Sequence, residues 1–202
     1  MKKLLWVLLI VAIGLPGGGA VASMLHTEDF SYTPGTLLTA TGNWASHSGT
    51  TNFIPVASPG LTYPGYLGSG IGEAASMTTS GEDDHTTAVW TANSGSVYMA
   101  FLVNFSAAQT AGDYFTHFYQ SSSLFYGRVY AKLVSGSVNF GVTRGSGTAN
   151  YSAAPFALGQ THLVVVKYTF VAGTTNDTAD LFVDPVLGGA EPAPLVSATD
   201  VA

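Results

Sequence analysis

Three polar side chains recur at every second position of one stretch, namely Arg128, Tyr130 and Lys132. Such positions share a face on an extended strand, so a phenol would lie between two cations. A polysaccharide lyase combines a base, often Tyr or His, with a cation that neutralises the acid group of its substrate. His117 is a candidate neighbour for this arrangement, the most enzyme-like in the chain. The alternative is an ordinary solvated strand face, along which the stems of the basic residues lie.

Two segments carry oxygen ligands of the kind that Ca²⁺ prefers. One holds Glu82, Asp83 and Asp84 in a presumed loop, and the other holds Asn176 and Asp177. Calcium takes about six to eight oxygen ligands, so either segment would need further donors. The alternative for the second segment is a turn in which the Asn and Asp side chains bond to the local backbone. A structural zinc site is not expected, because the chain has no Cys.

Aromatic side chains near turns are candidate platforms for sugar rings. Trp44, Tyr63 and Tyr66 are the leading candidates, and we expect the two tyrosines to be the most exposed because Pro and Gly flank them. The alternative is packing in the core or at its rim, since an aromatic ring buries a large area. Other aromatic residues in or beside expected loops are Trp90, Tyr119, Phe125 and Tyr126.

Alternating apolar segments must position these groups. Residues 162–185 are interpreted as a β-hairpin in which alternate residues of 163–170 form an apolar face and Pro185 ends the second strand. Residues 97–105 predict another strand, and a second hairpin is expected around the turn Ser135-Gly136-Ser137.

Composition favours an all-β chain. Only 9% of the residues are charged, Gly accounts for 24 of 202, and no long helical stripe is found. Short strands with turn signals between them predict an antiparallel two-sheet β-sandwich. A β-barrel is the alternative.

The N-terminus predicts a signal peptide over residues 1–22, followed by one domain over 23–202. A Lys pair precedes an apolar run over residues 4–15, and Ala20-Val21-Ala22 resembles a cleavage site. The run is short for a transmembrane span, although an uncleaved anchor is the alternative. We therefore expect a secreted or cell-surface protein with no stable membrane span after cleavage.

The negative net charge of the chain limits the kinds of molecule that it is expected to bind. Removal of Lys2 and Lys3 with the signal peptide would move the formal net charge from −6 to −8. Phosphate backbones would be repelled, so nucleic acid is not an expected partner. Calcium and neutral sugars are compatible with this charge.

Several motifs together resemble concanavalin A-like jelly-roll domains of the laminin-G/pentraxin type, as found in secreted bacterial proteins. The penultimate hairpin of that family is similar to LVVVKYTF followed by DLFVDP, with Asn176-Asp177 in the intervening loop. The opening segments EDFSYTPGTLL, GNWASHSG, SPGLTYPGYLGSGIGEA and SGEDDHTTAVW follow in the family's order. The resemblance covers about residues 28–185.

This resemblance implies a jelly roll of two curved sheets that binds glycans or mediates adhesion. Glycoside hydrolases of the same fold carry an E-x-D-x-x-E motif, which this chain lacks. Such domains close with a further strand beside the N-terminal one, whereas this chain ends at Thr199-Asp200-Val201-Ala202, so we expect a truncated domain without its final strand.

We therefore expect a non-catalytic recognition module for a polysaccharide or glycoconjugate. The alternatives are a structural spacer domain of a larger surface protein and a polysaccharide lyase-like enzyme.

Overall fold

The protein is built from antiparallel β-strands. The computed structural model describes residues 3–12, 22–121, 123–173 and 176–199, with side chains from residue 23 onward. Within these residues the only helical element is the 3-10 turn η1 (Leu38–Ala40). The all-β prediction is confirmed.

The largest sheet has eight strands. It contains β7 (Gly95–Phe105), whose neighbours are β12 (Thr161–Phe170) and β1 (Lys3–Ala12). The other members are β14 (Val196–Thr199), β13 (Thr178–Val183), β5 (Ala74–Met77), β4 (Val56–Ala57) and β2 (Ala22–Glu28).

Two smaller sheets complete the described fold. The four-stranded sheet has the order β11 (Asn150–Tyr151), β10 (Ser137–Thr143), β9 (Leu124–Val134) and β8 (Asp113–Ser121). A two-stranded sheet pairs β3 (Trp44–Ser48) with β6 (Asp83–Thr86). The described strands thus form separate open sheets and not the closed barrel of the alternative prediction.

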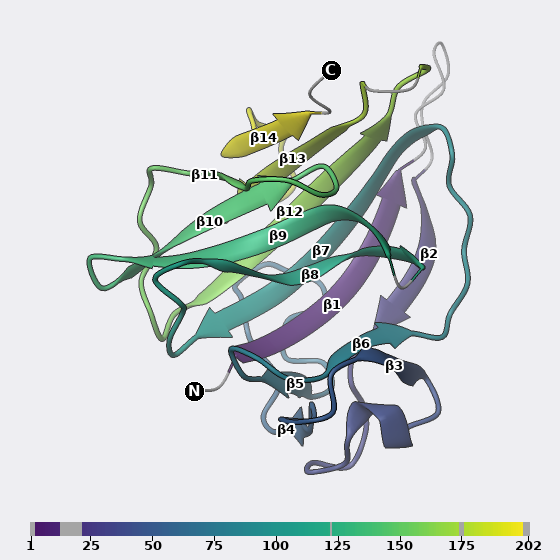
Figure 1. Ribbon diagram of the computed structural model, residues 1–202, viewed down its shortest axis with the longest axis vertical. Helices are drawn as coiled ribbons and strands as arrows, with labels where there is room; N and C mark the ends of the chain where they lie inside the picture. Colours follow the sequence, from purple (N-terminus) through teal and green to yellow (C-terminus); the bar gives the residue numbers. More distant parts are fainter. Residues whose placement is uncertain (1–2, 13–21, 122, 174–175, 200–202) are drawn as a thin grey trace.

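The eight-stranded and four-stranded sheets pack face to face around an aromatic core. Figure 1 shows the green strands β9 and β10 overlying β12 and β7. The ring of Phe105 on β7 lies 5.8 Å from that of Phe140 on β10, and Phe118 on β8 lies 6.4 Å from Tyr168 on β12. This packing agrees with the predicted two-layer arrangement of antiparallel sheets.

Both predicted hairpins are confirmed. Strands β12 and β13 pair from Val164 opposite Val183 to Thr169 opposite Thr178. Strands β9 and β10 pair across a tight turn, where Ser135 has φ 49° and Gly136 has φ 83°. Two consecutive positive φ values define the turn type that matches the twist of adjacent strands.

The predicted signal peptide overlaps a central strand. The backbone of β1 pairs with β7 over six residues, from Lys3 opposite Phe105 to Leu8 opposite Ala100, and also pairs with β5 and β2. At the other end of the chain, β14 pairs with β13. Residues 200–202, where a further strand was expected to begin, lie outside the described residues.

We expect Phe140→Ala to lower the free energy of unfolding by about 3–5 kcal/mol. The Phe140 side chain is fully buried and contacts the rings of Phe105, Phe156 and His162. Denaturant unfolding measures the loss. The matched control is Val186→Ala, because Val186 is 85% exposed and should change stability little. Similar losses in the two variants would contradict this account of the core.

Candidate ligand-binding site

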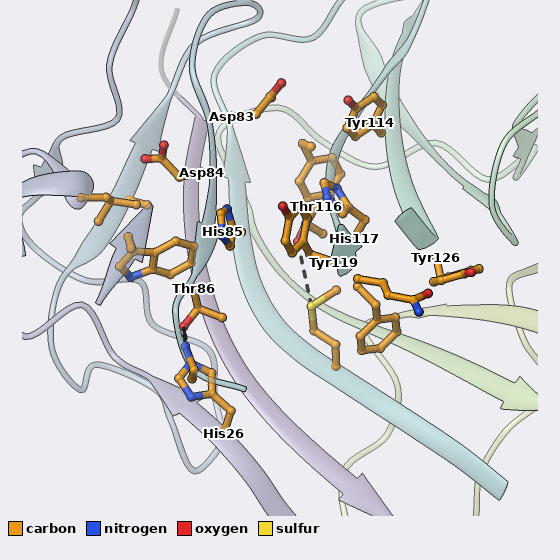
Figure 2. A pocket seen from close by; sticks show the side chains of 18 of the residues that line it. His26, Asp83, Asp84, His85, Thr86, Tyr114, Thr116, His117, Tyr119 and Tyr126 are labelled. Carbon is orange, nitrogen blue, oxygen red and sulfur yellow. Dashed lines mark hydrogen bonds between the residues drawn. The ribbon is translucent and has the colours of Figure 1, made fainter. Parts of the chain in front are cut away.

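The candidate site lies where β6 faces the edge strand β8. In the described residues β8 pairs only with β9, and β6 pairs only with β3. Side chains bridge the two edges: the ring of His85 on β6 stacks on Tyr119 of β8 at 4.1 Å, and the ring of His47 on β3 lies 5.0 Å from Tyr119. Figure 2 shows His85 and Tyr119 side by side.

Irregular pairing in β8 sets the direction of its side chains. The register with β9 shifts between Tyr114 and Thr116 and again between Thr116 and Phe118. Such bulges re-aim side chains along a strand. As a result, Phe115 and Phe118, which strict alternation would place on opposite faces, both contact core rings. His117 points the other way and contacts Phe125 at 4.4 Å.

A cavity of about 920 Å³ opens between β6, β8 and the loop before β7. This volume lies within the range of about 300–1,000 Å³ that is typical of small-molecule sites. Its floor is apolar and includes Val97 and Met99. Aromatic and titratable side chains in its walls include Trp44, Trp90, Tyr119, Glu82, Asp84 and His117.

Three histidines near the cavity have ring nitrogens without a hydrogen-bond partner among the described residues. Within the described residues, His47 has no hydrogen-bond partner at either ring nitrogen, and Nδ1 of His85 and of His117 also lack one. Burial lowers the pKa of His117 to about 3, with further lowering by the nearby charges of His47 and Arg128. Burial also lowers the pKa of His47. These two rings are therefore neutral at pH 7, and each offers one donor and one acceptor.

Two carboxyl groups meet on the face of β6 that is opposite to His85. One belongs to Asp84 on β6 and the other to Glu82, which directly precedes the strand. Glu82 and Asp84 are two residues apart, which places them on one face of an extended segment. Glu82 is only 9% exposed. Burial first, and then the charge and hydrogen-bonding proximity of Glu82, raise the pKa of Asp84 to about 7. Apart from the hydrogen bond between these two carboxyl groups, no donor among the described residues reaches Oε2 of Glu82 or either carboxyl oxygen of Asp84.

The three predicted aromatic platforms differ in burial and in their position relative to the cavity. Trp44 lines the cavity, but its ring stacks on Phe30 at 5.7 Å and its Nε1–H donates to Glu28 Oε2. Tyr63 is half-buried and lies outside the cavity lining. The expectation of an exposed Tyr66 is wrong: this residue is 8% exposed, since its loop folds over the sheet.

Arg128, Tyr130 and Lys132 share an outward face of β9, as predicted, and the buried Val129 and Ala131 alternate with them. None of the three outward residues lines the cavity.

Both cations of this face lie over the rings of neighbouring aromatic residues. The Arg128 guanidinium lies 5.1 Å from the centre of the Tyr114 ring and 5.0 Å from that of Phe125. Lys132 Nζ lies 5.4 Å from the ring centre of Tyr151. His117 is a neighbour of Arg128 through their shared contact with Tyr114. This face therefore resembles the alternative, an ordinary strand face along which the basic stems lie, more than an open lyase site.

The two predicted calcium segments belong to different elements of the fold, although Asp177 lines the same cavity as residues 82–84. Asn176 donates to the carbonyl of Ala172, and Asp177 accepts from Tyr168 and from the amide of Val171, so both side chains bond within their own turn. Residues 83–86 form the strand β6 and not the expected loop.

Asp83 on β6 accepts from the Ser48 hydroxyl. The described residues contain no group of three or more His, Asp or Glu side chains arranged to hold a metal ion. The calcium hypothesis thus gains no support from these side chains.

Comparisons with protein-family models, with curated proteins and with solved structures find no match to this chain. In the part of the chain that the structure describes, no helix is both long and apolar enough to cross a membrane.

We expect Asp84→Asn to stabilise the protein increasingly as the pH rises from about 4 to about 7. The unfolded Asp carboxyl releases its proton near pH 3.9, whereas the folded Asp84 holds it up to about pH 7. The wild-type protein therefore loses stability across this interval, and the variant does not. Thermal unfolding should show a higher Tm for the variant at alkaline pH, by roughly 2–4 °C for each kcal/mol regained.

The matched control for this pH series is Asp180→Asn on β13. Asp180 lies outside the cavity lining and accepts a hydrogen bond from the Ser197 hydroxyl. Its replacement weakens that bond, so we expect no gain in Tm at alkaline pH. A Tm difference between Asp84→Asn and wild type that is the same at every pH would show that the carboxyl is not protonated in the folded state.

Proposed function

We propose that this protein is an exported recognition module that binds a carbohydrate in the cavity between β6 and β8. The observation that carries the proposal is the cavity itself, of about 920 Å³, in which aromatic rings and unsatisfied polar groups converge. Sites for small organic ligands combine an apolar lining with a few polar groups that fix orientation.

The chemistry of the walls suits a sugar. Trp90 and Tyr119 are half-buried, so part of each ring is accessible at the cavity. A ring face offers an apolar surface to the C–H face of a pyranose. The neutral His117 offers a donor or an acceptor to a hydroxyl group.

A concanavalin A-like jelly roll is the finer fold that we propose. Its support is the order of the sequence motifs, from residue 28 to residue 185, together with the facing antiparallel sheets. In this proposal β3 and β6 extend the layer formed by β8 to β11, with the cavity interrupting it.

Recognition without catalysis is the role that we propose for this site. The alternative lyase residues Arg128, Tyr130 and Lys132 lie outside the cavity, and aromatic rings cover the two cations. A spacer domain, the other alternative, would not account for the unsatisfied polar groups in the cavity walls.

We expect Trp90→Ala and Tyr119→Ala each to weaken carbohydrate binding by about tenfold or more, since burying the apolar face of a large side chain contributes on the order of 1.5–3 kcal/mol. A glycan array identifies the ligand for the wild-type protein, and calorimetry then compares the variants.

Tyr130→Ala is the matched control, because this tyrosine lies on the outer face of β9 and not in the cavity. Its affinity should equal that of the wild type. Loss of binding in Tyr130→Ala with full binding in Trp90→Ala would move the site to the outer face. Failure of the wild-type protein to bind any glycan would remove the proposed function.

Export predicts a defined mature N-terminus. We expect cleavage after Ala22, so the protein recovered outside the producing cell should begin at Ser23. Intact mass and N-terminal sequencing measure this directly. Replacement of Ala20 and Ala22 by bulky residues should block processing, and a chain found only inside the cell with residue 1 intact would contradict export.

A further inference from the structure

Three buried carboxyl oxygen atoms in one wall of the cavity receive no donor from any other part of the described protein. They are Oε2 of Glu82 and the two carboxyl oxygens of Asp84. Apart from the hydrogen bond that the protonated Asp84 makes with Glu82, no donor among the described residues reaches them. Glu82 is nine-tenths buried and lines the cavity, so a molecule must enter the cavity to reach its free oxygen. Leaving buried acceptors unsatisfied is costly, most of all when they are charged.

The local electrostatics favour a cation at this position. The charges that act on Asp84 come from Glu82 and Asp83, and both are negative. Among the described lining residues Arg144 is the only Arg or Lys, and its guanidinium lies 5.7 Å from the ring centre of Tyr126, on the four-stranded sheet. A cation that entered beside Asp84 would therefore relieve the repulsion that the protein otherwise avoids by keeping a proton on Asp84.

We propose that Glu82 and Asp84 bind the ammonium group of an amino sugar, so that the carbohydrate ligand contains unacetylated amine groups. This inference rests on the proposed carbohydrate-binding function and names its ligand class. An ammonium group carries three N–H donors and no acceptor, so it can reach all three oxygens once it replaces the single proton that Asp84 otherwise holds against Glu82. Aromatic rings in the same cavity, including Trp44 and Trp90, then contact the body of the sugar.

Other cations fit this wall less well. Calcium requires about six to eight oxygen ligands, and the described residues provide no cluster of three or more His, Asp or Glu side chains suited to a metal. A neutral N-acetyl group presents one N–H donor, adds a carbonyl acceptor and brings no positive charge, so it fits the two carboxyl groups less well.

The experiment compares a glucosamine tetrasaccharide with its N-acetylated counterpart by calorimetry on the full chain. We expect the amine form to bind about tenfold to a hundredfold more tightly, as befits hydrogen bonds to charged groups. Glu82→Gln and Asp84→Asn should each reduce this preference by about tenfold. Circular dichroism confirms that each variant folds, and either folded variant suffices for the test.

The matched control is Asp180→Asn, which removes one carboxylate outside the cavity and should leave the preference unchanged. Equal affinities for the two tetrasaccharides, or an unchanged preference in Asp84→Asn, would overturn the inference. Binding of another glycan but of neither tetrasaccharide would also overturn it and leave the proposed function standing. An oligolysine peptide that binds as tightly as the amine form would show that the site recognises the ammonium group without the sugar. That outcome would overturn the amino-sugar assignment.

Discussion

The candidate site depends on a contact between side chains that replaces a ladder of backbone hydrogen bonds. If β6 and β8 paired directly, their backbones would lie about 4.8 Å apart and would leave no opening between them. The stacked rings of His85 and Tyr119 join the two edges, with His47 packed against the same tyrosine. The strands are thereby held as neighbours while their backbone edges stay apart, and the cavity occupies the space that a ladder would close.

This arrangement separates two kinds of titratable group on the two faces of β6. His85 packs with aromatic rings on one face, whereas Asp84 lies with Glu82 on the other. Burial acts on both kinds in the same way, because it disfavours the charged form. It keeps His117 neutral and holds a proton on Asp84 up to about pH 7. The cavity therefore has neutral hydrogen-bonding groups at one wall and carboxyl groups that become charged above about pH 7 at the other.

The sequence predicts those elements whose signals are local. The hairpins around 135–137 and 173–178 carry both the alternation and the turn chemistry in one short stretch, and both are found. The site is different, because its histidines come from β3, β6 and β8 and no spacing links them. The bulges of β8 also depend on pairing with β9, so a strict alternation assigns its side chains to the wrong faces. Tyr66 is buried for a similar reason: its Pro-Gly loop folds over the sheet, which local composition does not reveal.

Residues 3–12 illustrate the limit of reading an apolar run in isolation. The hydrophobic segment of a signal peptide and a strand buried at the centre of a sheet are both short continuous apolar runs. In the structure this segment supplies backbone partners to β7 on the side away from β12. Cleavage after Ala22 would remove those partners and leave the central strand of the sheet with an open edge, which is a template for pairing with another strand. The segment can therefore serve as a cleaved signal or as the strand beside β7, but a mature chain cannot have both.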